Sequence, residues 1–291
     1  MKKRLTITAD CTCDLSDEII EKYNIKLLPF NILTERWSFR DRDEITARNV
    51  LDYISSGGQA RSEAPGTEEC IRFFSEQLDH AEKIIHICMS SEASLSFRNC
   101  CQAMKEMDDK AANIWLLDSK HLSTGTGHIV IKACELAEKG LPPEKIKKEL
   151  EIFRERISTS FIVRNADYLY NNKKAGLFLR KVCSLFELHP VIVMRNGRLR
   201  LKKIYRGDYE KAELRYVTSE LKNNQKIDNE RLFITHAGCS FREIETLRKR
   251  IERITSFKEI CTTEASAVVS SNCGPNSVGV IYVREQNERV N

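Results

Sequence analysis

Short apolar runs alternate with stretches of helical periodicity through the first half of the chain. KIIHICM (83–89) precedes a helical pattern that starts near Phe97, and IWLLDS (114–119) precedes GHIVIKACELAEKG (127–140). Parallel strands need such crossover helices, because consecutive parallel strands cannot be joined by a tight turn. The alternation therefore predicts an α/β domain with a mostly parallel sheet, whose ligand site lies at the carboxyl ends of the strands.

The pattern changes after a charged amphipathic helix predicted over 141–157. Fewer, longer β runs follow, such as HPVIVMRNGRLRLKKIY (189–205) and SVGVIYV (277–283), and helices separate them. A chain of 291 residues is long enough for two domains with separate cores. We therefore predict an N-terminal α/β domain over 1–157 and a C-terminal α+β domain over 158–291, with the ligand between them.

Composition argues against several classes of protein. The net charge is +5, but basic and acidic residues are interleaved, which is not typical of a nucleic-acid-binding protein. The eleven cysteines are scattered through apolar runs and helix faces, as buried thiols of a reducing cytoplasm would be, and they suggest no disulfide framework or structural metal. No apolar run approaches the ~20 residues that a membrane span needs. The composition predicts a cytoplasmic protein.

Hydroxyl-rich segments follow the apolar runs. Four serines occur within seven residues after KIIHICM, and similar polar segments are found at 8–15, 59–66, 116–127 and 268–277. Backbone N–H groups and hydroxyls at helix N-termini can bind a carboxylate or a phosphate. For a single segment, an ordinary capped turn is the more common case. Convergence of four such segments at one sheet edge makes an anion site as well supported as four capped turns.

Motifs of known catalytic loops are missing. The sequence contains no G-x-S-x-G, G-x-x-x-x-G-K-[ST] or G-x-G-x-x-G, and His86 falls inside a predicted strand, where a packed core histidine is the common case. Asp10, Asp14 and Asp118 adjoin Ser or Thr turns, where an aspartate either caps backbone N–H groups or binds a metal. We expect capping, and no metal site.

A helix predicted over 174–188 is strongly apolar and carries few charges. It is either part of a core or one wall of an apolar pocket. The residues that would line such a pocket are Leu177, Phe178, Val182 and Phe186.

The ordered set of motifs resembles the DegV family of bacterial fatty-acid-binding proteins. A-D-C-T-C-D-L (9–15) is similar to the family's D-S-T-x-D-L, and M-S-S-E-A-S-L-S-F-R-N-C (89–100) is similar to I-S-S-x-L-S-G-T-Y-Q-S-A. LLDSKHLSTGTG (116–127), KIYRGDYEKA (203–212) and N-C-G-P-N (272–276) resemble later family motifs. The resemblance runs the length of the chain, in order and with matching spacing.

The resemblance implies positions for the head group of a fatty acid. It assigns the carboxylate-binding serine to Ser94, and it implies further head-group positions at Arg61, Ser62, Leu95, Ser96, Asn272 and Gly274. Four positions depart from the family pattern. Arg61 replaces a threonine, Leu95 a glycine and Asn272 a histidine, and Lys174 lies in a segment where the family has G-G-R-I. We predict that Arg61 takes over part of the carboxylate binding; a solvated surface arginine is the alternative.

The resemblance also implies a function. It implies a carrier, not an enzyme, that needs no cofactor, encloses a long-chain fatty acid and presents its carboxylate to a separate fatty acid kinase. Arg206 would lie on the face that docks the kinase. Two alternatives stay open: a binder of another amphiphile or small anion, and a metal-dependent acyl or phosphoryl enzyme that uses Asp10 and Asp118.

Overall fold

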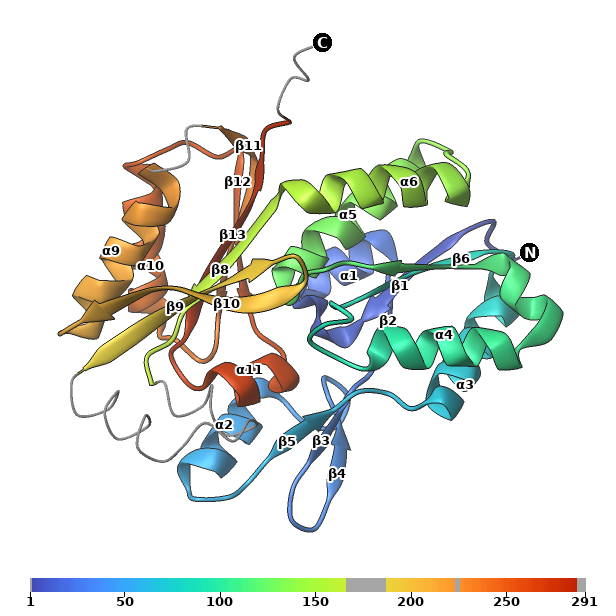
Figure 1. Ribbon diagram of the computed structural model, residues 1–291, viewed down its shortest axis with the longest axis horizontal. Coiled ribbons are helices and arrows are strands. Elements are labelled where there is room, and N and C mark those ends of the chain that lie inside the picture. The colour runs from blue at the N-terminus through green and yellow to red at the C-terminus, as the bar shows by residue number, and fades with distance from the viewer. Residues whose placement is uncertain (1, 166–186, 223–225, 287–291) are drawn as a thin grey trace.

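The computed structural model describes residues 2–165, 187–222 and 226–286, and its N-terminal part contains a parallel sheet (Figure 1). Four strands pair in the order β2-β1-β6-β7, and all neighbours are parallel. This arrangement confirms the α/β prediction. The strands are β1 (Thr6–Asp10), β2 (Lys26–Leu28), β6 (Ile84–Cys88) and β7 (Ile114–Asp118).

Helices cover both faces of this sheet. One face packs against α1, α5 and α6, and the other packs against α3 and α4. Alternate residues of β6 serve the two faces, since Ile85 and Ile87 belong to the first cluster and Ile84 and Cys88 to the second. The helices are α1 (Asp17–Tyr23), α3 (Thr67–His80), α4 (Ser96–Glu106), α5 (Thr124–Glu138) and α6 (Pro143–Phe153).

A small antiparallel sheet lies beside the first one. Its order is β4-β3-β5, and the helices α2 and α11 pack against each other beside it. The sequence predicts one extended run over KLLPFNI, but the structure divides it at Pro29, which cannot donate a backbone hydrogen bond. The elements are β3 (Asn31–Leu33), β4 (Ser38–Arg40), β5 (Arg61–Glu63), α2 (Ala47–Ser55) and α11 (Ala267–Cys273).

The C-terminal part is a six-stranded mixed sheet. Its order is β10-β9-β8-β13-β11-β12, in which only β11 and β12 pair in parallel. Helices α9 and α10 cover one face. The elements are β8 (Ile157–Ile162), β9 (Leu188–Arg195), β10 (Arg198–Arg206), β11 (Ile227–His236), β12 (Glu259–Glu264), β13 (Val278–Arg284), α9 (Tyr209–Lys222) and α10 (Phe241–Glu252).

The two large sheets share a hydrophobic cluster. Ile129 and Val130 of α5 pack in one cluster with Phe233 of β11 and Ile281 of β13. The proposed division at 157/158 falls at the start of β8. Helix α11 follows most of the second sheet in sequence, yet it packs on α2, so the chain returns to its first part near the end.

The sequence analysis predicts a polar loop over residues 268–277, but the structure has helix α11 there as far as Cys273. Ser266 caps this helix, because its hydroxyl accepts a hydrogen bond from the N–H of Val269. The predicted tail-pocket residues Leu177, Phe178, Val182 and Phe186, and Lys174, lie outside the described residues. In the part of the chain that is described, no helix is long and apolar enough to cross a membrane.

Candidate functional site

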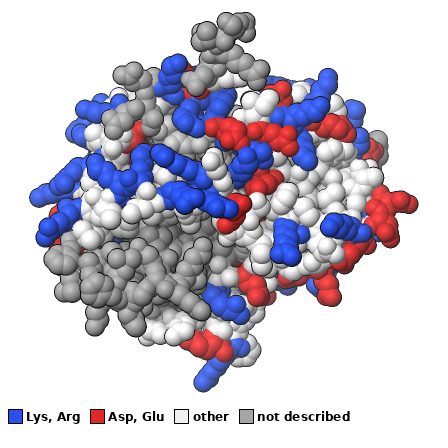
Figure 2. All heavy atoms as spheres, viewed as in Figure 1, with Lys and Arg blue, Asp and Glu red and all other residues white. Residues whose placement is uncertain are grey.

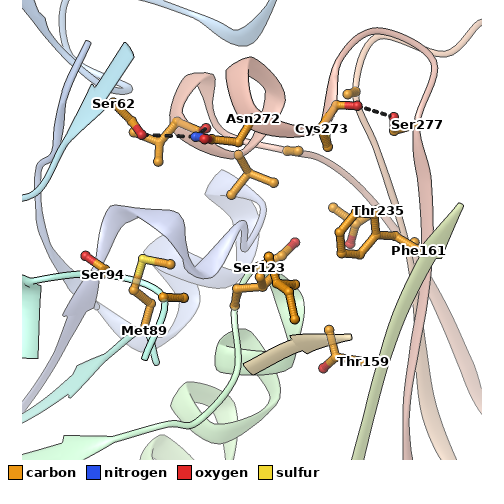
Figure 3. Close-up of a pocket in the computed structure, with 18 of the residues that line it drawn as sticks. Ser62, Met89, Ser94, Ser123, Thr159, Phe161, Thr235, Asn272, Cys273 and Ser277 are labelled. Carbon is orange, nitrogen blue, oxygen red and sulfur yellow. Dashed lines mark hydrogen bonds between the residues drawn. The ribbon is translucent and has the colours of Figure 1, made fainter. Parts of the chain in front are cut away.

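A pocket lies at the carboxyl edge of the parallel sheet, between that sheet and the mixed sheet (Figure 3). Its volume is about 590 Å³, within the range of about 300 to 1,000 Å³ that is usual for small-molecule sites. Segments from both halves of the chain line it. They are β5, the serine turn (residues 89–95), the start of α5, β8, Leu199 of β10, the end of β11, α11 and β13.

Two aspartates at the ends of strands in the parallel sheet hold the serine turn in place by accepting hydrogen bonds from it or from the start of α4. Asp10, at the end of β1, accepts hydrogen bonds from Met89 N (2.8 Å) and from the hydroxyl of Ser96 (2.8 Å). Asp118, at the end of β7, accepts from the N–H (3.2 Å) and the hydroxyl (2.6 Å) of Ser91. Both carboxylates therefore cap N–H and hydroxyl groups in and beside the turn, as the sequence analysis expects.

Two more aspartates hold α11. Asp14 accepts from Ser266 N (2.9 Å) and from the hydroxyl of Ser123 (2.6 Å). Asp41 accepts from the N–H groups of Ala267 (2.9 Å) and Val268 (3.1 Å). Burial raises the pKa of Asp14 to about 7, although these hydrogen bonds oppose the shift, and burial also raises the pKa of Asp41. Both carboxylates join the start of the chain to its end.

The serine turn also contacts the mixed sheet. The hydroxyl of Ser90 donates to the carbonyl oxygen of Gly197 (2.6 Å), and Arg198 pairs with Glu92 (2.7 Å). Gly197 lies in the β9–β10 hairpin turn with a positive φ of 78°, and a Cβ there would meet the Ser90 hydroxyl oxygen at 2.9 Å. The turn is thus fixed by contacts with both sheets.

The hydroxyls that line the pocket fall into two groups. The first group is engaged within the protein: Ser91 donates to Asp118, Ser123 to Asp14 and Ser277 to the carbonyl oxygen of Cys273. Thr159 bonds His121 (2.9 Å), Thr235 bonds Thr124 (2.7 Å), and Ser160 bonds Tyr216 (2.9 Å).

Ser62 and Ser94 form the second group. Ser62 accepts from Asn272 Nδ2 at 3.0 Å, and Ser94 accepts from Ser96 N at 3.2 Å. Within the described residues, neither hydroxyl donates a hydrogen bond. Each one is oriented by its incoming bond, so its own proton remains available for an acceptor in the pocket.

Other predicted head-group residues also reach the pocket. Arg61 and Leu95 line it, and Leu95 is 59% exposed at the start of α4. The side chain of Arg61 makes no ion pair or hydrogen bond with the described part of the chain. Asn272 donates to Ser62 and to the carbonyl oxygen of Val268 (2.7 Å), and it lies on the same side of the view as Ser62 and Ser94 (Figure 3).

The structure does not bring Ser96 or Gly274 into the lining, and Arg206, which was predicted for the docking face, also lies outside it. Ser96 is buried and donates to Asp10, so its hydroxyl fixes the turn instead of facing a ligand. Gly274 ends α11 with a positive φ of 79°, a conformation that favours glycine. Arg206 ends β10, and Gly207 follows it with a φ of 92°.

An apolar side of the pocket was not singled out by the sequence. Phe161 comes from β8, Ile281 from β13, and Val268 and Val269 from α11. Two of these residues could have been found from the alternation of inward and outward positions along β8 and β13. The two valines could not, because their segment was predicted to be a loop. Gly279 leaves no room for a side chain on this side, because a Cβ there would lie 2.9 Å from Ile281 Cδ1 and 3.2 Å from the Ser160 carbonyl oxygen.

The fold and the pocket define a two-domain α/β protein that can enclose an amphiphilic small molecule, with apolar side chains on one side and hydroxyls on the other. The chain belongs to the DegV family. The family model, described as "Uncharacterised protein, DegV family", matches residues 4–285.

Relatives and solved structures cover almost the whole chain. A DegV domain-containing protein of Staphylococcus aureus is 24% identical over 288 residues, which are 98% of this chain and 100% of the relative. A structure titled "Fatty Acid Binding of a DegV family Protein from Thermus thermophilus" has a TM-score of 0.82 at 22% identity, covering 97% of this chain and 100% of the other. A Streptococcus pneumoniae "Fatty Acid Kinase (Fak) B3 protein loaded with linoleic acid" has a TM-score of 0.82 at 18% identity, with the same coverage. These similarities confirm the predicted fold.

Proposed function

We propose that this chain is a carrier that binds one long-chain fatty acid in the pocket, with the carboxylate at Ser62 and Ser94 and the tail along the apolar side. The observation that carries the proposal is the pair of hydroxyls whose protons have no acceptor among the described residues. Solved DegV structures whose descriptions name fatty acid binding support it.

The chemistry of the two sides fits an amphiphile with an anionic end. A hydrogen bond from a hydroxyl to a carboxylate is worth roughly 1.5 to 3 kcal/mol. Each methylene removed from water contributes about 0.8 kcal/mol, so a tail of about fifteen methylenes gains at most roughly 12 kcal/mol before ordering costs. The tail therefore supplies most of the affinity, and the hydroxyls select the orientation.

Arg61 is the second group proposed for the carboxylate. Arg61 belongs to the pocket lining, next to Ser62 in β5, and its side chain has no hydrogen-bond or ion-pair partner within the described residues. A guanidinium can bind a carboxylate through two parallel N–H bonds, whereas the threonine that it replaces offers one hydroxyl. Arg61 therefore compensates for the change from threonine in the family pattern.

We further propose that the bound acid is presented to a separate fatty acid kinase. A solved relative is named a Fatty Acid Kinase (Fak) B3 protein. Arg206 would contact the kinase from the end of β10, a strand whose sequence RLRLKKIYR is mostly exposed and basic. Figure 2 shows Lys and Arg gathered over this part of the surface. The serine turn is joined to the same hairpin through Gly197 and Arg198, which connects the head group to the proposed docking strand.

Extraction of the purified protein tests the binding proposal. Because nearly all of the tail would be out of water, dissociation is expected to be slow, and denaturation should release a long-chain fatty acid that mass spectrometry identifies. Repeated extraction without lipid, together with no uptake of added palmitate or oleate, would contradict it. Release of another amphiphile would favour the alternative binder that Arg61 and Leu95 leave open.

The domain boundaries, the cellular location and one alternative function rest on the sequence pattern. We propose domains over 1–157 and 158–291, and a cytoplasmic location, on the pattern of the sequence. A metal-dependent enzyme that uses Asp10 and Asp118 is less well supported, because both carboxylates accept hydrogen bonds from the serine turn. Incubation with divalent metal and phosphoester or acyl-ester substrates tests this alternative, since a carrier turns nothing over.

A further inference from the structure

A cluster of thiols and one imidazole lies next to the serine turn. His86 and Cys88 are alternate residues of β6, so their side chains leave the same face of the sheet, where Cys100 of α4 packs. The potential ligand atoms of these three residues all lie within 4.8 Å of one another, and all three residues are fully buried. A fourth thiol, Cys70 of α3, lies with its sulfur 3.6 Å from the sulfur of Cys100.

The two ring nitrogens of His86 have different surroundings. His86 Nδ1 lies 2.8 Å from Thr8 Oγ1, and the Thr8 hydroxyl lies 3.4 Å from the carbonyl oxygen of Ile85, to which it donates. Thr8 therefore accepts from Nδ1–H, which leaves the lone pair on Nε2. Within the described residues Nε2 has no hydrogen-bond partner, and Asp10 Oδ1 lies 3.4 Å away. A lone pair so close to a carboxylate is unfavourable, so the nitrogen needs a positive charge beside it, which either a proton or a metal ion can supply.

We propose that this positive charge is a zinc ion bound by His86 Nε2, Cys88 Sγ and Cys100 Sγ, with Cys70 Sγ as the nearest group for the fourth position. Zinc bonds of about 2.3 Å to sulfur place two tetrahedral ligands about 3.8 Å apart, which is close to the 3.6 Å between Cys70 and Cys100. Cys70 is outside the group of three, so its side chain has to turn to complete the site.

The ligand chemistry favours zinc over the hard cations. Thiolates and imidazole suit zinc, whereas magnesium and calcium prefer oxygen ligands. Two thiolates neutralise a divalent ion, so binding by His86, Cys88 and Cys100 alone leaves no net charge in this buried position. A third thiolate from Cys70 would add one negative charge. The hydrogen bond from Nδ1–H to Thr8 is the outer contact that commonly orients a metal-binding histidine.

The ion would have a structural role for the head-group site. Cys88 ends the strand before the serine turn, and Cys100 lies in the helix after it. A shared ion would tie the two ends of the turn together and fix the position of Ser94. The inference is independent of the lipid proposal, because metal content is measured without a lipid.

Metal analysis of the full chain tests the inference. The protein is expressed with added zinc and purified under reducing conditions without chelator or histidine tag. Elemental analysis should find about one zinc ion per chain. Refolding with Co²⁺ in place of zinc should give the near-ultraviolet absorption of thiolate-to-cobalt charge transfer. Less than about one tenth of an ion per chain together with no cobalt–thiolate band would overturn the proposal.

A matched pair of variants locates the site. Cys100→Ala is expected to lower zinc content by at least about tenfold. Cys134→Ala removes a buried thiol of α5 on the other face of the sheet and should retain the ion. Equal zinc content in the two variants would overturn the assignment. Should Cys100→Ala fail to fold, Cys100→Ser takes its place, because serine keeps the shape of the side chain but is a poor zinc ligand.

Discussion

The two sides of the pocket are built in different ways. The apolar side consists of strands β8 and β13 and one face of α11, whose backbone is fixed by their own regular hydrogen bonds. The polar side consists of the serine turn and the short strand β5, and side chains from distant parts of the sequence hold them in place, as Asp10 does for the serine turn and Asn272 does for Ser62. Affinity and head-group selection therefore have separate structural bases, so single substitutions can change one without the other.

The largest effect is expected from a charge on the apolar side. Val269 lines the pocket at the third position of α11, where an aspartate suits the helix dipole. Val269→Asp should therefore keep the helix but place an unpaired charge against the tail, weakening palmitate binding by about 100-fold. Val269→Leu is the matched control, with a change of at most about tenfold in calorimetric titration. An Asp variant that binds like the Leu control would show that the tail does not contact α11.

The second-largest loss of affinity is expected from substitution of Arg61. Arg61→Ala is expected to weaken fatty-acid binding by about 30-fold, against about tenfold for Ser62→Ala, because a bidentate charged contact exceeds a single hydroxyl bond. Arg98→Ala, an exposed arginine of α4 outside the pocket, should bind normally in the same titration. Equal or negligible losses for Arg61 and Ser62 would indicate that Arg61 is a solvated surface residue.

A smaller effect separates the two groups of hydroxyls. Ser94→Ala is expected to weaken binding by about tenfold without much loss of stability. Ser277→Ala removes a hydroxyl of the same pocket that donates to the Cys273 carbonyl oxygen, so it should lower the free energy of unfolding by about 1 kcal/mol and leave affinity nearly unchanged. Titration and urea unfolding of both variants check this. The distinction between free and engaged hydroxyls fails if the two variants behave alike.

The carboxylates behind the polar side should affect stability more than affinity. Burial raises the pKa of Asp14 from 3.8 to about 7 in the folded state. The unfolded chain loses this proton first, so the contribution of Asp14 to stability falls as the pH rises through that interval and is lowest above it. Wild type should therefore lose stability relative to Asp14→Asn between pH 4 and 7, by roughly 4 kcal/mol at most. If urea unfolding gives the same pH dependence of stability for wild type and Asp14→Asn, the raised pKa of Asp14 is rejected.

The smallest effect on lipid binding is expected outside the pocket. Arg206→Ala changes an exposed residue at the end of β10, so lipid content should not change. Formation of acyl phosphate with the cognate kinase should fall, because a charge at a rim affects association with a partner more than it affects a buried ligand. Loss of lipid, or wild-type rates with the kinase, would remove Arg206 from the docking face.

The sequence predicts the fold well where local pattern decides it. The run IIHIC followed by four serines correctly placed β6, the serine turn and α4, because strand period, turn residues and helix period change within a few residues. Pro29 could have indicated the break between β2 and β3. Helix α11 was not predicted, since Ser270, Ser271 and Asn272 in its second half are also typical of a loop.

The site is predicted less completely because its properties depend on distant contacts. Ser62 and Ser91 look alike in sequence, but Asn272 donates to the first and Asp118 accepts from the second. The cluster of His86, Cys88 and Cys100 has no close ligand pair of the usual kind, because a strand and a helix bring its members together. Such arrangements become visible only once the sheet order is known.

The dependence of affinity on chain length tests the central claim most directly. Palmitate has four more methylenes than dodecanoate, and each buried methylene contributes about 0.8 kcal/mol. If the apolar side supplies the affinity, palmitate should bind roughly 100-fold more tightly than dodecanoate in the same titration. Equal affinities for the two acids would contradict the account, because the polar side would then supply nearly all of the binding energy.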